Sequence, residues 1–148
     1  MQGPVKKFSL VKPTLDTPFH IDFAWWKDSD SNWRIFLHGF LCEDHQLTFE
    51  GQNDNTEMDA IDPETAEIKK ADALLHTLIT HCAQQEEFLQ GNLPLVGQIF
   101  RIFLSNGNQP LSPNQLSTLV SKPARTILIT IGGQRVFKGI RPILQVPN

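Results

Sequence analysis

The last third of the chain has a hydrophobic pattern of helical period, interrupted at residues that favour turns. Apolar side chains recur every three or four positions in 96–104, 113–120 and 123–131, which predicts three short helices. Asn106-Gly107-Asn108 separates the first helix from the second, and Ser121-Lys122 separates the second from the third. This order of helix, loop, helix, short break and helix predicts a compact three-helix unit.

The second and third predicted helices carry recognisable start and stop signals. Ser112 can cap the second helix, and Pro113 suits its first turn. Gly132-Gly133 ends the third helix, and 134–144 predicts a basic β-ribbon. The expected inward positions are Ile99, Phe100, Phe103, Leu104, Leu116, Leu119, Val120, Ala124, Ile127, Leu128 and Ile131.

A different fold competes for the same residues. Thr126–Ile131 is a β-branched run, and Gly132-Gly133 is a good two-residue turn into a second strand over 134–140. A hairpin there would remove the third helix. The spacing of helix, break and helix over 113–131 favours the helical interpretation.

The N-terminal half predicts a mixed region with two core helices and short strands. Alternation over 19–26 predicts a strand, and a helical stripe predicts a core helix over 32–44. Residues 57–61 and 66–68 predict two strands joined by an Asp-Pro turn, and 70–88 predicts an amphipathic helix. The whole chain is therefore expected to be α+β. The stripe residues are Trp33, Phe36, Leu37, Phe40 and Leu41 in the first helix, and Ala71, Leu74, Leu75, Leu78, Ile79 and Cys82 in the second.

Charge divides the chain more sharply than its total of −3 suggests. All sixteen acidic residues lie between Asp16 and Glu87, so the first 87 residues carry a net charge of −9. No Asp or Glu follows, and six Lys and Arg residues give the rest of the chain +6. This separation indicates either that the basic part faces a polyanion or that the two halves attract each other.

The order of elements in the C-terminal third resembles a winged helix-turn-helix. We expect two domains, an acidic region over 1–92 and a basic domain over 93–148, with the boundary near Gly91-Asn92. The resemblance implies that the third helix enters the major groove of DNA while the ribbon contacts the backbone as a wing. It implies a DNA-binding protein without catalysis, used in regulation of transcription. The implied DNA-binding residues are Lys122, Arg125, Thr126, Ile129, Thr130, Arg135, Lys138 and Arg141.

The same fold has a second common use, as a surface for protein contacts. Ile129 is expected to point outward, and an exposed isoleucine suits a protein interface as well as it suits a thymine methyl group. The alternative function is therefore a non-enzymatic adaptor that binds a protein partner or a second copy of the chain.

Cys42, His45, His81 and Cys82 contain the ligand types of a two-cysteine, two-histidine zinc site. Two observations argue against metal binding. Both cysteines adjoin apolar helix faces, and adjacent residues 81 and 82 would point apart if they lay on one helix. The sequence therefore favours buried structural thiols and predicts no cofactor.

Catalysis has one weak candidate, a magnesium-dependent nuclease site built from Asp59 or Asp62 with Glu67 and Lys69. These residues are crowded around a predicted turn, so a solvated turn is the preferred interpretation. The chain has no Gly-rich phosphate loop and no nucleophile-elbow motif. It also has no apolar run of about 18 residues, and its start lacks the pattern of a signal peptide. A cytoplasmic, non-enzymatic protein without a membrane partner is expected.

Overall fold

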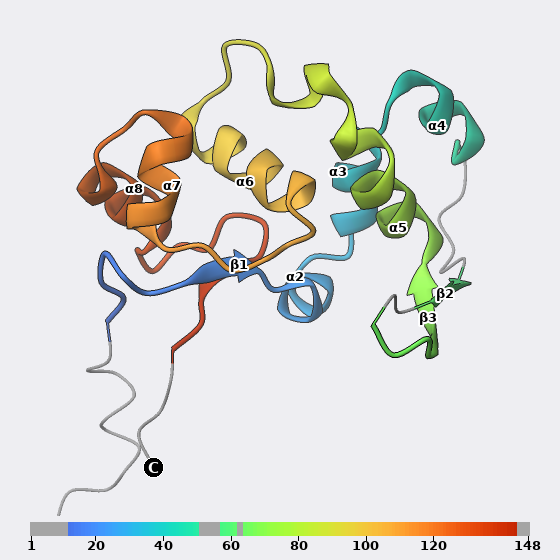
Figure 1. Ribbon diagram of the computed structural model, residues 1–148, viewed down its shortest axis with the longest axis horizontal. Helices are drawn as coiled ribbons and strands as arrows, with labels where there is room; N and C mark the ends of the chain where they lie inside the picture. Colours follow the sequence, from blue (N-terminus) through green and yellow to red (C-terminus); the bar gives the residue numbers. More distant parts are fainter. Residues whose placement is uncertain (1–11, 51–56, 62–63, 145–148) are drawn as a thin grey trace, which may run out of the picture.

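A computed structural model describes residues 12–50, 57–61 and 64–144 of the chain, and Figure 1 shows their arrangement. The C-terminal third contains α6 (Leu95–Ser105), α7 (Pro113–Val120) and α8 (Ala124–Ile131). The three helices predicted here are confirmed, and the competing hairpin over 126–140 is wrong. Ile127 and Ile131 are buried while Ile129 is 70% exposed, which is the pattern of a helix and not of a strand.

The residues around α7 explain why its limits match the prediction. The Ser112 hydroxyl accepts a hydrogen bond from the amide of Gln115, and the Gln115 side chain accepts one from the amide of Ser112, which completes a capping box. Ser121 ends the helix in the left-handed conformation, at φ 56° and ψ 41°. The Ser117 hydroxyl, on α7, donates a hydrogen bond to the carbonyl of Lys122, and this bond stabilises the turn between α7 and α8.

An N-terminal strand completes the C-terminal unit. β1 (Phe19–Ile21) pairs antiparallel with β4 (Ile140–Pro142), and Phe19 also forms a bridge with Leu111. β1 therefore lies between two segments from the far end of the chain, as Figure 1 shows. The β-ribbon predicted over 134–144 is wrong. Residues 134–139 form turns and bends, and β4, which follows them, pairs with β1.

The helices after β1 differ from the prediction. The strand ends at Ile21 because the Asp22 carboxylate accepts a hydrogen bond from the amide of Trp25 and starts α2 (Phe23–Ser29). The single helix expected over 32–44 is divided into α3 (Trp33–His38) and α4 (Glu43–Thr48). Gly39 ends α3, and tight turns continue the apolar spacing beyond it.

A β-hairpin and a short helix follow. β2 (Glu57–Ile61) pairs antiparallel with β3 (Ile68–Asp72), which confirms the predicted hairpin with a longer second strand. The helix expected over 70–88 is shorter than predicted. The Asp72 carboxylate accepts from the amide of Leu75 and starts α5 (Ala73–Thr80), which is followed by two 3₁₀ turns, η1 (Cys82–Gln84) and η2 (Glu86–Leu89).

One hydrophobic core connects the N-terminal helices to α6. The rings of Trp26, Phe36 and Phe100 lie with centroids 5.7–5.8 Å apart in edge-to-face contacts, so α2, α3 and α6 share one aromatic cluster. The division at residue 92 stays a prediction, although β1–β4 pairing and this cluster both cross it. In the described ranges, no helix is long and apolar enough to cross a bilayer.

Candidate functional site

The candidate nucleic-acid site is the outer surface of α8 and the turn that precedes it. α7 and α8 pack against each other and are joined by Ser121-Lys122-Pro123, a turn of the length found in helix-turn-helix motifs. Buried Ile127 fixes the rotation of α8, because this side chain is fully enclosed. The exposed side of the turn and helix carries Lys122, Arg125, Thr126, Ile129 and Thr130, as the sequence predicted.

The structure brings these five positions together but does not make them equivalent. The Thr130 hydroxyl donates to the carbonyl of Thr126, so its proton is used within the helix. Ile129 presents an apolar side chain between polar neighbours. Lys122 and Arg125 therefore provide the positive charge of this surface, and neither is in an ion pair within the described residues.

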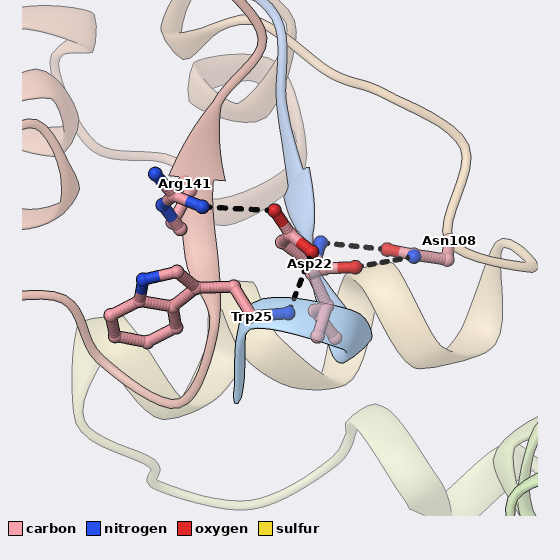
Figure 2. Close-up of polar contacts among 5 residues, drawn as sticks. Asp22, Trp25, Asn108 and Arg141 are labelled. Atoms are coloured by element: carbon pink, nitrogen blue, oxygen red, sulfur yellow. Dashed lines mark hydrogen bonds and ion pairs between the residues drawn. The ribbon is translucent and has the colours of Figure 1, made fainter. Parts of the chain in front are cut away.

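Two of the predicted wing residues contact the acidic half of the same chain. The Arg141 guanidinium donates to the Asp22 carboxylate at 3.0 Å and lies over the Trp25 ring at 5.1 Å (Figure 2). The Lys138 ammonium lies 3.9 Å from the Asp30 carboxylate and 4.5 Å from the centre of the Phe36 ring. These contacts fit the expectation that the two halves attract each other, and the assignment of Lys138 and Arg141 to a DNA-contacting wing stays a prediction.

The contacts of Arg141 and Lys138 form a junction between the acidic and basic halves of the chain, and Asp22 lies at its centre. Its two carboxylate oxygens accept from Trp25 and from Arg141, while the Asn108 amide bonds both the N–H and the carbonyl of Ile21 beside it (Figure 2). Three separate segments of the chain, around residues 21–25, 108 and 141, therefore meet at the end of β1. The role of Asp22 as the N-cap residue of α2 could be predicted, because an aspartate before an apolar run is a typical helix start.

Asp30 belongs to the same junction. The pKa of its carboxyl is lowered, first by the hydrogen bond from the amide of Asn32, with smaller effects from the Trp26 indole and from Lys138. Asp30 is consequently ionised and available to Lys138 across the neutral range. Arg135 is the remaining predicted wing residue, and it is exposed on the turn before β4.

A sixth cation of the basic region is structural. Arg101 lies on α6 with its guanidinium 4.7 Å from the Phe40 ring and 4.9 Å from the Phe88 ring, and it donates to the Phe88 carbonyl. Burial lowers the pKa of this guanidinium from its ordinary value. Arg101 is thus enclosed by aromatic rings, and Lys122, Arg125 and Arg135 are the freely exposed cations among the described residues after 88.

The structure also brings together Cys42, His45 and His81 of the candidate zinc set, and Cys82 lies beside the first two of them. These four residues are here called the Cys/His cluster. The Cys42 sulfur lies 3.1 Å from His45 Nδ1, and the Cys82 sulfur lies 3.3 Å from Cys42 and 3.4 Å from His45 Nδ1. Possible ligand atoms of Cys42, His45 and His81 all lie within 4.8 Å of one another. The premise of the expectation that residues 81 and 82 point apart, that both lie on one helix, is wrong. The helix ends at Thr80, and His81 departs from it at φ −122° and ψ −65°.

Both cysteines are free, and they differ in environment. Cys82 is buried and Cys42 is half-buried. Desolvation raises the pKa of the Cys82 thiol to about 11, so without a bound cation this sulfur stays protonated at neutral pH. A thiol of this kind is not a reactive nucleophile.

The residues considered for a nuclease are not assembled into a site where the structure describes them. Asp59 lies on β2 and Glu67 precedes β3, and both are exposed on the hairpin. Asp62 lies outside the described residues, and the side chain of Lys69 does as well. Neither Asp59 nor Glu67 belongs to a group of three possible metal ligands among the residues that the structure describes.

An apolar pocket lies beside the candidate nucleic-acid surface. Its volume is about 340 Å³, and it is formed by η2, α6 and α7 with the segments that join them. Leu89 and Leu119 on its rim are 49% and 58% exposed. Its other lining residues are Leu93, Gln98, Ile102, Ser105, Asn106, Leu111 and Val120. The inward position expected for Leu119 is therefore wrong.

Comparison of the chain with protein-family models, with curated proteins and with solved structures found no match.

Proposed function

We propose that the chain is a non-enzymatic DNA-binding protein of winged-helix type, with α8 as its recognition helix. The observation that carries this proposal is the outward face of α8 and its preceding turn. There, Lys122 is exposed on the turn, and Arg125 is exposed on a helix whose opposite face is buried. A helix presented in this way fits the major groove, where an arginine can bond two acceptors of one guanine.

The charge distribution supports a polyanionic partner. No acidic residue occurs after Glu87, so nothing in the C-terminal sequence opposes the approach of phosphates to α8. Arg135, on the turn between α8 and β4, is the cation that we assign to backbone contact. By analogy with other helix-turn-helix proteins, we propose regulation of transcription as the role of this binding.

The salt dependence of binding tests the proposal quantitatively. Each neutralised phosphate adds about 0.9 to the slope of log affinity against log salt concentration. Three exposed cations therefore predict a slope of about −3 for one chain on a random duplex. Fluorescence polarisation of the full chain with a labelled duplex, titrated at several salt concentrations, measures this slope.

Variants separate the roles of the cations. Arg135→Ala should make the slope about one unit less steep on every duplex. Arg125→Ala should reduce discrimination between preferred and random duplex by about 1–3 kcal/mol. Lys27→Ala is the matched control, because Lys27 is an exposed cation near the end of α2 in the acidic half. No duplex binding at low salt, or equal losses in Lys27→Ala and Arg125→Ala, would contradict the proposal.

The apolar pocket supports a second candidate function, that of a protein adaptor. Exposed Leu89 and Leu119 on the rim of a pocket suit the insertion of an apolar side chain from a partner or a second copy of the chain. This function predicts no duplex binding and self-association or partner binding that Leu119→Asp abolishes. Ile35→Asp is the control, since Ile35 is 64% exposed on α3 and lies outside the pocket. Sedimentation of both variants measures the self-association.

A further inference from the structure

We infer that the Cys/His cluster is a structural zinc site, with Cys42, His45, His81 and Cys82 as its four ligands. The cluster is independent of the proposed DNA-binding surface. In Figure 1, α4 lies near one end of the long axis of the molecule, and α8 lies near the other. The inference reverses the interpretation favoured by the sequence, in which the two cysteines were structural thiols.

The three distances among the Cys42, His45 and Cys82 ligand atoms are close to those of a zinc tetrahedron. Zinc–sulfur bonds of about 2.3 Å and zinc–nitrogen bonds of about 2.0–2.1 Å place two sulfurs about 3.8 Å apart and a sulfur and a nitrogen about 3.5 Å apart. The observed sulfur–sulfur distance is 3.3 Å, and the two sulfur–nitrogen distances are 3.1 and 3.4 Å. Separation of these atoms by a few tenths of an ångström is enough to admit the ion.

Local structure explains why the four side chains converge. Cys42 precedes α4 as its N-cap residue, and His45 follows three positions later, so both lie at the start of this helix. The opposing pair comes from the place where α5 ends and η1 begins. The break after Thr80 rotates His81 away from the helical path, and its ring lies edge-on to His45 with centroids 4.6 Å apart.

The donor set favours zinc over other cations. Two thiolates and two imidazoles in a tetrahedron are the ligands of structural zinc, whereas magnesium and calcium select oxygen. Four protein ligands leave no open position for a substrate, so the site is structural. His81 is exposed and Cys42 and His45 are half-buried, which leaves a route for the ion from solvent.

A cross-link at this place would stabilise a helix that has little contact with the hydrophobic core. None of the six residues of α4 is buried, so the hydrophobic core does little to hold this helix. The chain leaves the helical body after α4, forms the β2–β3 hairpin and returns through α5 (Figure 1). A zinc ion would join the two ends of this excursion, where Cys42 and Cys82 are 40 positions apart. Metal binding would then stabilise α4 and the base of the hairpin together.

A disulfide between the same cysteines is the competing chemistry. It would involve only the two sulfur atoms, so it would not explain why His45 and His81 lie close to Cys42. The two states are distinguishable, because a disulfide removes both free thiols and zinc retains them.

Metal analysis of the full chain tests the inference. The protein is purified without added metal, desalted and analysed by mass spectrometry for zinc, and its thiols are counted after denaturation with a chelator. Wild type and His76→Ala should hold about one zinc ion per chain and two thiols. Cys42→Ser and His45→Ala should hold none. His76 lies on α5 outside the cluster and is the matched control.

Cobalt titration keeps the test decisive if a ligand variant fails to fold. Chelator-treated wild type, refolded in reducing buffer, should bind one equivalent of Co²⁺ with the intense visible bands of a tetrahedral site and thiolate charge-transfer absorption. Zinc should then displace the cobalt. Wild type without zinc that binds cobalt only weakly in six-coordinate form, or that contains an intramolecular disulfide in place of zinc, overturns the inference. Equal zinc in His45→Ala and wild type does so as well.

Discussion

The Asp22 carboxylate accepts a hydrogen bond from the Arg141 guanidinium at 3.0 Å, although the two residues are 119 positions apart in the sequence. Asp22 also caps α2, and Arg141 lies in the middle of β4. The pair therefore joins α2 of the acidic half to β4 of the basic half. A cation that the sequence assigned to DNA is used to hold the chain together.

Arg141→Ala should consequently change stability and leave DNA binding almost intact. The Arg141 side chain is 39% exposed, so solvent screens the pair, and its loss should lower the free energy of unfolding by about 0.5–1 kcal/mol. Urea denaturation measures this loss. The salt slope of duplex binding should stay at the wild-type value, whereas Arg135→Ala lowers it. A slope reduced equally by both substitutions would assign Arg141 to phosphate contact instead.

Ile127→Asp and Ile129→Asp should have opposite outcomes. Ile127 is fully buried, and removal of such a side chain alone costs about 2–5 kcal/mol before the penalty of an unpaired charge is added. Ile129 is 70% exposed, so its substitution should leave the thermal midpoint within a few degrees of wild type. Circular dichroism melting curves compare the two. Similar damage from both would contradict the orientation of α8.

The helices of the C-terminal third were predictable because their signals are local. Ser112 and Pro113 mark the start of α7, and the period of Ile127 and Ile131 identifies α8. The partner of β4 was not predictable in this way. Strand pairing between Phe19 and Pro142 depends on tertiary packing, and no short-range pattern records it. The charge asymmetry predicted either that the basic part faces a polyanion or that the two halves attract each other. The ion pairs of Lys138 and Arg141 fit the second interpretation.

Gly139→Ala should destabilise the junction of β4 with α2. Gly139 has φ +81°, and an added Cβ would lie 3.0 Å from the Trp26 Cβ and 3.1 Å from the Asp22 carbonyl. Backbone strain and this contact together should cost about 2–3 kcal/mol in urea denaturation.

Two other glycines separate the causes. Gly107 has φ +73° with no atom within 4 Å of the added Cβ, so Gly107→Ala should show the backbone strain of about 1 kcal/mol alone. Gly133→Ala, with open space and no positive φ, should be almost neutral. Equal effects of the substitutions at 107 and 139 would mean that Trp26 moves aside easily.

Asp72→Asn should be strongly destabilising even though asparagine is a good helix cap. The Asp72 carboxylate forms an ion pair with Arg34, whose side chain is only 9% exposed. Asparagine preserves the cap of α5 and breaks this largely buried ion pair, at a cost of about 3–5 kcal/mol. The double variant Arg34→Met with Asp72→Asn should recover most of this loss in urea denaturation. A double variant no more stable than Asp72→Asn would show that the pair is not the cause.

The N-terminal half was less predictable because its helices are short and its patterns ambiguous. The apolar spacing of Phe36, Leu37 and Phe40 continues through the turn at Gly39, so it predicted one helix where there are two. The same extrapolation carried a helix through His81 and Cys82, whereas the structure ends α5 at Thr80 and places His81 beside Cys42 and His45. The position of a helix end therefore decided the interpretation of the Cys/His cluster, and helix ends are the least certain feature of a periodic pattern.

The pairing of β1 with β4 has a consequence for biosynthesis. Phe19 and Ile21 are among the first residues of the fold to leave the ribosome, and Ile140 and Pro142 are among the last. Until translation reaches them, the nascent strand lacks its β4 partner, and its two large apolar side chains lack their final cover. Rapid translation of the last third of the chain, or a chaperone that holds the early strand, would shorten the period in which this edge can pair with that of another nascent chain.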